Sequence, residues 1–406
     1  MKTKFLYLIT IVLLGGCALQ PAYDGDAAIG KRSAQDVLTA SPLYSSLGDI
    51  DFSEFDLLEM SPEMIEFTDR AVGSSGAQSE QLRKLAYAIM RSGEFSLAYE
   101  DTTGTAVETF ERRRGNCMAF TNMFVAMARY LGIDARYQEV DVPPTWSMSG
   151  DSFLYSQHIN VHVDLKQGRW REVDFNIYDF DHELETRIIR DNRARAHYFN
   201  NIGAERMLAD ETGPAYGYFR QSLREDGEFA SAWINMGILH RREGLNDLAE
   251  AAFLEALRVG GADTLDLTRH TGDVGWMSSR QTDTDLIAMS NLANLYEEMG
   301  HTDLAARYFE RVHAHRMKNP YYRYQVAESA FEEGDYASAI DNLQYAIRRR
   351  KNEDEFYYLL SLSHLMKGDR QEARTWMKKA EEVAAENSEK QKYHYKLDLL
   401  RNLDKN

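Results

Sequence analysis

One cysteine, two histidines and one aspartate have the types and spacing that nucleophilic catalysis requires. Cys117 follows Arg114-Gly115-Asn116, and His158 and His162 lie on a segment of alternating polarity that a short turn joins to Asp174. In acyl transfer a thiolate attacks an acyl carbon, an imidazole holds and moves the proton, and a carboxylate orients the imidazole. The sequence therefore predicts a cysteine nucleophile, on the condition that folding brings these side chains together.

The residues after Asn116 have the spacing of a buried helix. Apolar side chains recur at intervals of four, three and four residues, at Phe120, Phe124, Met127 and Leu131. Asn116 suits the N-cap and Gly132 ends the pattern, so Cys117 is expected in the first turn. The helix dipole there favours a thiolate by only about 1 kcal/mol, so a histidine partner is also needed.

Residues 158–174 have the pattern of a β-hairpin. Apolar residues alternate with polar ones, which places Ile159, Val161, Val163 and Leu165 on one face and His158, Asn160, His162 and Asp164 on the other. Lys166-Gln167-Gly168 provides the turn.

The turn fixes which residues of the hairpin meet. It pairs Leu165 with Arg169. In that register His158 and Asp174 become diagonal neighbours on one face of the sheet, within side-chain reach. His162 is also diagonal to Asp174, so strand pairing alone does not choose between the two histidines.

This order of motifs resembles the transglutaminase-like cysteine domain, a relative of papain-like peptidases. The resemblance rests on Gly115-Asn116-Cys117, on the following helix, and on a histidine that precedes a strand of alternating polarity. It implies an α+β domain over residues 46–195, with Cys117, His158 and Asp174 as the catalytic residues. In that family the aspartate ends a strand that begins near a tryptophan, as Asp174 follows Trp170.

The second half of the chain carries an internal repeat. Small residues stand at Gly203, Gly237, Ala293, Ala327 and Ser361, with spacings of 34, 56, 34 and 34. Twelve residues after each comes an alanine, and four further on a large apolar residue: Phe219, Phe253, Phe309, Leu343 and Met377. These columns resemble five tetratricopeptide repeats over 196–387, with an insertion at 264–285 and a capping helix at 388–406. The resemblance implies an all-α solenoid that binds a protein or peptide partner.

Four amides hold one position of the repeat pattern. Asn201, Asn235, Asn291 and Gln325 each lie two residues before the small residue of their repeat. Amides in a row on a concave surface would bond the backbone of an extended peptide. The alternative is that these residues cap or solvate their helices.

The amino terminus predicts export and lipidation. Lys2 and Lys4 precede an apolar run over 5–14, which is too short to span a membrane and reads as a signal peptide over 1–16. Gly15-Gly16-Cys17 resembles the lipobox of bacterial lipoproteins, which implies acylation of Cys17 and anchoring to the cell envelope. Ala18 in place of aspartate is typical of sorting to the periplasmic face of the outer membrane. The alternative is an ordinary secretory signal with an incidental cysteine.

Composition narrows the functional classes to which the chain could belong. The chain holds 47 Lys and Arg against 64 Asp and Glu, a net charge of −17, which disfavours nucleic acid as a partner. It contains only two cysteines, so acylation of Cys17 leaves Cys117 without a disulfide partner. We find no phosphate loop, no metal-ligand spacing and no cofactor fingerprint, so no metal and no cofactor are expected. Residues 17–45, with scattered Pro, Gly and Ser, are predicted to be a tether.

Three functions agree with these features. The first is an envelope cysteine hydrolase of peptide or amide bonds, whose repeats bind a partner or substrate. The second is a transglutaminase that transfers the acyl group to an amine. The third is a non-catalytic scaffold in which the repeats act alone. The sequence does not decide between water and an amine as the acyl acceptor.

Overall fold

The computed structural model describes most of the chain. The described residues are 30–46, 52, 55–73, 76–90, 95–140, 147–149, 152–154, 158–166, 168–175, 186–261, 283–384 and 387–402. The predicted signal peptide, the predicted lipidation site Cys17 and residues 264–282 of the predicted insertion lie outside them. Within the described ranges, no helix is both long enough and apolar enough to cross a membrane.

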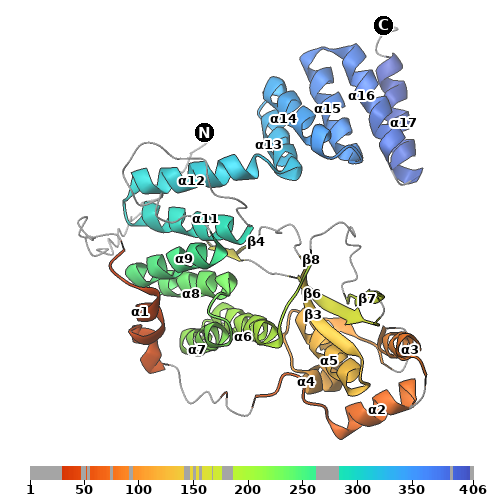
Figure 1. Ribbon diagram of the computed structural model, residues 1–406. Helices are drawn as coiled ribbons and strands as arrows, with labels where there is room; N and C mark the ends of the chain where they lie inside the picture. The colour runs from red at the N-terminus through yellow and green to blue at the C-terminus, as the bar shows by residue number, and fades with distance from the viewer. Residues whose placement is uncertain are drawn as a thin grey trace, which may run out of the picture.

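A four-stranded antiparallel sheet organises the amino-terminal domain, residues 52–190 (Figure 1). The strands lie in the order β7-β6-β3-β8 and comprise β3 (Asp134–Val140), β6 (His158–Asp164), β7 (Trp170–Val173) and β8 (Thr186–Ile188). Two short pairs join β1 (Ala98–Tyr99) to β2 (Arg114–Gly115) and β4 (Ser147–Ser149) to β5 (Ser152–Leu154). The helices of the domain are α2 (Pro62–Val72), α3 (Gln78–Met90), α4 (Ala106–Arg112) and α5 (Cys117–Tyr130).

The hairpin of β6 and β7 has the predicted register. The amide of Leu165 donates to the carbonyl of Arg169 at 2.9 Å, and Val161 lies opposite Val173. The alternation of β6 is also confirmed, because Ile159 and Val163 are buried in one apolar cluster with the side chains of α5. Period-two alternation therefore places the apolar face of β6 against the helix that begins with the cysteine.

Helix α5 begins and ends where the sequence predicts. The side chain of Asn116 accepts a hydrogen bond from the amide of Ala119, which makes Asn116 the N-cap and Cys117 the first helical residue. The helix ends at Tyr130 with Leu131 as its C-cap, and Gly132 follows with φ of 71°, a left-handed value that suits glycine.

The second half of the molecule is a stack of antiparallel helix pairs (Figure 1). The pairs are α6 (Asp191–Leu208) with α7 (Thr212–Glu225), α8 (Ala230–Arg242) with α9 (Asn246–Gly260), α11 (Asp283–Glu298) with α12 (Thr302–Arg316), α13 (Pro320–Glu332) with α14 (Tyr336–Arg349), and α15 (Asp354–Lys367) with α16 (Arg370–Val383). Helix α17 (Asn387–Asn402) follows the last pair. We call α6–α17 the repeat array.

The turn inside each pair falls seven residues after the small residue of its repeat. Gly244, Gly300, Gly334 and Gly368 have φ between 69° and 99°, and Asp210 takes the same left-handed conformation with φ of 59° in the first pair. A residue with a Cβ pays a steric cost there, which explains why glycine fills four of these five turns.

Small residues let the two helices of a pair approach closely, as the columns predict. A Cβ added to Gly237 would stand 2.5 Å from the ring of Phe253, and one added to Gly203 would stand 2.6 Å from the ring of Phe219. Both rings are fully buried. The large residue of each column thus occupies the space that the small residue leaves.

We expect Gly237→Ala to lower the free energy of unfolding by about 1–3 kcal/mol, because the added methyl overlaps a ring that is packed on all sides. Urea unfolding followed by circular dichroism measures this difference. Gly227→Ala is the matched control, since a Cβ there meets only the carbonyl of Leu223 at 3.6 Å. An equal change in both variants would contradict the close-approach explanation.

Helix α6 belongs to both halves of the molecule. Tyr198 and Phe199 are buried in the cluster of the amino-terminal domain, whereas Met207 is buried in the cluster of the repeat array. The helix begins at Asp191, which pairs with Arg129 of α5 at 2.6 and 2.8 Å, so the predicted domain boundary at 195/196 falls inside a helix. The two halves therefore share a structural element.

A buried ionic network reinforces this junction. Glu139 of β3 is 6 % exposed and accepts hydrogen bonds from His197 at 2.7 Å and from Arg193 at 2.9 Å, both of α6. Arg187 of β8 donates to the other oxygen of the same carboxylate at 3.1 Å. Arg193 also bonds Asp226, in the connection between α7 and α8, at 3.0 Å.

The segment predicted as a tether is partly folded onto the array. Residues 34–39 form α1 (Ala34–Thr39), whose Val37 is buried together with side chains of α7–α9. The Tyr216 hydroxyl donates to the carbonyl of Val37 at 2.9 Å, and the Gly30 amide donates to Glu250 at 3.0 Å. The prediction of a tether over 17–45 is wrong for residues 30–45, because their apolar side chains pack against the repeat array.

The insertion is shorter than predicted. Helix α11 begins at Asp283, and Asp285 is 1 % exposed inside it, so the predicted insertion at 264–285 overlaps a folded helix. The capping helix begins at Asn387, one residue before the predicted start.

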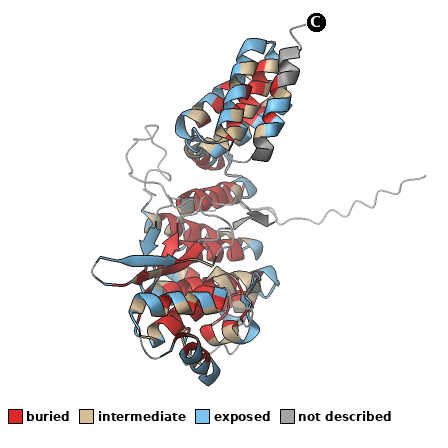
Figure 2. Cartoon of the chain, turned by 90° about the vertical axis from the view of Figure 1, so that its right-hand side faces the viewer, coloured by how far each residue is buried: buried red, intermediate tan, exposed pale blue. Residues whose placement is uncertain are grey.

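The repeat array is interrupted between α12 and α13. Figures 1 and 2 show α13–α17 as a separate group beyond α12, and the buried side chains of α11–α12 and of α13–α15 form separate clusters. Phe309 of α12 is 37 % exposed, whereas its counterparts Phe219, Phe253 and Leu343 are 0 % exposed. The surface of α12 that holds Phe309 is therefore incompletely covered by α13.

Candidate active site

The cysteine lies where a helix end stabilises negative charge. Cys117 is the first residue of α5 and is partly exposed, and it has no disulfide partner among the described residues. The first four amides of a helix have no partner within it, and they give the helix start a partial positive charge. A thiolate at this position gains from both effects.

The structure brings Cys117, His158 and Asp174 together. Nε2 of His158 lies 2.8 and 2.9 Å from the two carboxylate oxygens of Asp174. Cys117 lies close enough to His158 to favour the charged form of its imidazole. Because Nε2 is engaged by the carboxylate, Nδ1 is the nitrogen that remains for the sulfur.

The second histidine of the strand has a different environment. His162 lies opposite Glu172 in the neighbouring strand, and its ring stacks on Trp170 at 5.5 Å. Asp174 bonds His158 instead. The structure thus makes the choice that strand pairing left open, and it agrees with the choice that the family resemblance implied.

Electrostatics favour the charged form of His158. Burial alone would lower the pKa of this imidazole, since the residue is 8 % exposed. The hydrogen bonds to Asp174 and Cys117 and the charges of both groups outweigh burial and raise the pKa to about 9. The imidazolium is therefore the dominant form at neutral pH.

Asn160 holds the carboxylate, a role that we did not predict from the sequence. Its Nδ2 donates to Asp174 at 3.1 Å, so Asp174 is held between Asn160 and His158. Asn160 is 4 % exposed, and its Oδ1 is buried without a hydrogen-bond partner among the described residues. The signal was present, because the predicted register places Asn160 directly opposite Asp174.

Thr121 fixes the helix against the strand that carries the histidine. Its hydroxyl donates to the carbonyl of Ile159 at 3.3 Å. Thr121 lies one helical turn after Cys117, and Ile159 follows His158 in the chain. This bond therefore sets the distance between the cysteine and the histidine, and no pairing rule of sequence analysis predicts it.

The loop over 102–104 supports the start of α5. Asn116 donates from Nδ2 to the Thr103 hydroxyl at 2.8 Å and from its backbone amide to Thr102 at 3.0 Å. Asn122, fully buried in α5, donates to the carbonyl of Gly104 at 2.9 Å. Gly115 must be small, because a Cβ there would stand 2.5 Å from that of Ala119.

The four amides of the repeats do not present one row of donors. Asn235 and Asn291 are buried, and their amide groups donate to Asn200 at 2.9 Å and to the carbonyl of Ile287 at 3.0 Å. Asn201 is half-buried and Gln325 is exposed. In this state the peptide ladder lacks its two central donors, because both are already used within the array.

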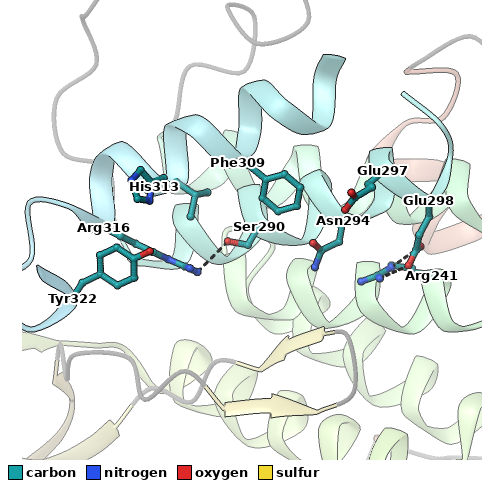
Figure 3. Close-up of a pocket in the computed structure, with 10 residues that line it drawn as sticks. Arg241, Ser290, Asn294, Glu297, Glu298, Phe309, His313, Arg316 and Tyr322 are labelled. Atoms are coloured by element: carbon teal, nitrogen blue, oxygen red, sulfur yellow. Dashed lines mark hydrogen bonds and ion pairs between the residues drawn. The ribbon is translucent and has the colours of Figure 1, made fainter. Parts of the chain in front are cut away.

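A pocket of about 510 Å³ lies in the array, at the interruption between α12 and α13 (Figure 3). At one end Arg316 lies beside Tyr322 and bonds Ser290 at 3.4 Å. At the other end Arg241 pairs with Glu298. Strand β5 of the amino-terminal domain contacts α11, whose Ser290 lines this pocket.

Metal chemistry has no obvious site here. Across the described ranges, no group of three or more His, Cys, Asp or Glu side chains is arranged to hold a metal ion.

Comparisons with known proteins identify both halves. The model of the Transglutaminase-like superfamily matches residues 65–175. Two tetratricopeptide repeat models match residues 287–312 and 324–389. No curated protein matches the chain.

Solved structures are similar to about half of this chain. YrrB, described as a TPR protein with an unusual peptide-binding site, is 16 % identical over 48 % of this chain and 89 % of its own, with a TM-score of 0.24. PilF of Pseudomonas aeruginosa is 12 % identical over 53 % and 88 %, with a TM-score of 0.27. MamA of Desulfovibrio magneticus RS-1 is 16 % identical over 47 % and 94 %, with a TM-score of 0.24.

The order of the two matches is the order that the sequence predicts. The domain with Cys117, His158 and Asp174 precedes the stacked helix pairs, and the family models match in the same order along the chain. The chain therefore consists of a transglutaminase-like core domain followed by tetratricopeptide repeats.

Proposed function

We propose that the protein is a cysteine hydrolase of peptide or amide bonds, and that its repeat array binds a protein partner or substrate. The observation that carries this proposal is the position of His158, which is hydrogen-bonded to Asp174 and lies beside Cys117. This is the arrangement that activates a thiol for attack on an acyl carbon.

Each residue has a defined step in the proposed reaction. The Cys117 thiolate attacks the carbonyl carbon and forms a carbon–sulfur bond, while the carbonyl electrons move to oxygen. The backbone amide of Cys117, at the start of α5, stabilises the oxyanion. When the intermediate collapses, the carbon–nitrogen bond breaks and His158 gives its proton to the leaving amine.

Water then resolves the thioester. His158, now neutral, takes a proton from the attacking water as its oxygen bonds the acyl carbon. The carbon–sulfur bond then breaks, the acid product leaves, and the thiolate–imidazolium pair is restored. Asp174 stays ionised throughout and holds the imidazole in position. An amine in place of water would give transamidation by the same residues.

The nature of the acyl acceptor is settled by product analysis. We expect the purified protein to release ammonia or peptide fragments from casein in buffer, and to incorporate little of an added biotinylated primary amine. Cys117→Ala should abolish all three signals. Dominant incorporation of the amine would instead establish a transglutaminase, and equal signals from Cys117→Ala would leave the repeat array as the functional part.

We also propose that the protein is anchored through a lipid on Cys17 to the bacterial cell envelope, at the periplasmic face of the outer membrane. The support is the run Gly15-Gly16-Cys17 after a short apolar segment, with Ala18 following. Cys17→Ser is expected to move the protein from the membrane fraction to the soluble fraction. Retention of the variant in membranes would refute the anchor.

A further inference from the structure

A chain of hydrogen bonds links the repeat array to the helix that carries Cys117. Glu205 lies in α6, two residues after Gly203, the small residue at which α6 packs on α7. Its carboxylate accepts the backbone amide of Thr103 at 2.8 Å and is also bonded by the Thr103 side chain. The first repeat thus holds a loop of the amino-terminal domain.

The same loop residue holds the start of α5. The Thr103 hydroxyl accepts Nδ2 of Asn116 at 2.8 Å, and Thr103 is 3 % exposed. Oδ1 of Asn116 accepts the amide of Ala119 at 3.0 Å, which orients the side chain that caps the helix. Asn116 directly precedes Cys117, so these hydrogen bonds lead to the residue beside the nucleophile.

We propose that Glu205 is a positioning residue of the active site, through which the first repeat holds the cap of the Cys117 helix in place. The proposal rests on the proposed function, since it assigns a control to the same site. A partner that shifts α6 would then alter the position of the sulfur, because α6 is shared between the array and the domain.

The choice of a carboxylate in a half-buried place supports this role. A buried acid costs desolvation, and burial raises the pKa of Glu205 although Thr103 hydrogen-bonds to it and lowers it in part. An apolar residue would avoid this cost but would leave the Thr103 amide without its acceptor. The carboxylate thus stands where it accepts a hydrogen bond from the loop that supports the start of α5.

The test measures the rate at which iodoacetamide alkylates Cys117 as a function of pH. We expect Glu205→Ala to slow alkylation near neutral pH by on the order of tenfold, since one charge-assisted bond is lost. Its pH profile should move towards that of an unpaired thiol. Glu205→Gln should recover most of the rate, because the amide oxygen accepts the same backbone amide. Glu211→Ala is the matched control, as this exposed side chain bonds only Arg206 among the described residues.

A second variant tests the inference in case Glu205→Ala does not fold. Thr103→Val removes the hydroxyl that bonds Asn116 but keeps the backbone bond to Glu205, and it is expected to shift the pH profile as Glu205→Ala does. The inference is overturned if Thr103→Val and a folded Glu205→Ala react like the wild type. The proposed function fails separately if His158→Ala is alkylated as fast as the wild type.

Discussion

Replacing His158 with alanine is expected to slow the alkylation of Cys117 by iodoacetamide near pH 6 by at least about tenfold. A cysteine without a charged partner is on the order of 1 % thiolate or less at this pH, whereas an imidazolium pair keeps the sulfur ionised. The geometry supports this pairing, since His158 lies beside Cys117 and is hydrogen-bonded to Asp174. Mass spectrometry of the alkylated peptide over time gives the rate.

The pH dependence sharpens this prediction. The pKa of His158 is raised to about 9 from an ordinary value of 6.5. The stabilisation that the charged imidazole gives to the folded site is therefore complete below pH 6.5 and is lost as the pH rises through about 9. The advantage of the wild type over His158→Ala should therefore persist to about pH 8 and vanish above 9.

His162→Ala is the matched control for His158→Ala. It lies on the same strand and stacks on Trp170, so it tests the loss of a neighbouring imidazole. We expect its rate to equal that of the wild type. If His162→Ala lowers the rate as much as His158→Ala, the assignment of the catalytic histidine is wrong.

Glu139→Ala is expected to lower the free energy of unfolding by about 3–5 kcal/mol, the largest effect on stability that we predict. The substitution leaves Arg193 and His197 without the carboxylate that both bond, at 2.9 and 2.7 Å. Because Arg193 is 15 % exposed in its side chain, water restores little of the loss. Urea unfolding followed by circular dichroism measures the difference.

Acid should weaken the same network in the wild type. Burial would raise the pKa of Glu139, but the bonds and charges of His197, Arg193 and Arg187 outweigh it and hold the pKa far below its ordinary value of 4.5. Its contribution to stability is therefore present above 4.5 and is lost as the pH falls below it. Burial lowers the pKa of His197, whereas the hydrogen bond to Glu139 and the charge of that carboxylate act to raise it.

Asp134→Ala provides the control on the same strand. Its partner Arg136 and Asp134 itself are 50 % and 42 % exposed, so removing this pair is expected to cost less than about 1 kcal/mol. Equal losses in Asp134→Ala and Glu139→Ala would show that burial does not govern the strength of this network.

Local rules predicted the parts of the site, and tertiary contacts selected among them. The capping residue Asn116 and the alternation of β6 follow from backbone chemistry and period-two burial, so both were visible in the sequence. The choice between His158 and His162 was not, because both project from the same face. It depends on where α5 meets the sheet, which the bond from Thr121 to Ile159 sets between segments far apart in the chain.

The repeats also combine features that local rules predict with features that depend on tertiary contacts. The close approach at Gly237 was predictable, because the large residue of the column recurs at a fixed distance from the small one. The folding of residues 30–46 was not, since Val37 covers a surface that exists only after α7–α9 have assembled. Phe309 and Phe253 are the same residue type in the same column, and only the structure shows that one of them is left partly open.

That opening at Phe309 divides the repeat array energetically. In a linear repeat protein, the stability of each unit depends on its own helices and on the interfaces with its nearest neighbours. Where α13 leaves α12 incompletely covered, the coupling term between neighbours is weak, so melting on one side is transmitted poorly to the other. We therefore expect helices α13–α17 to unfold as a cooperative unit of their own, so that denaturant resolves two transitions where an unbroken solenoid of this length gives one.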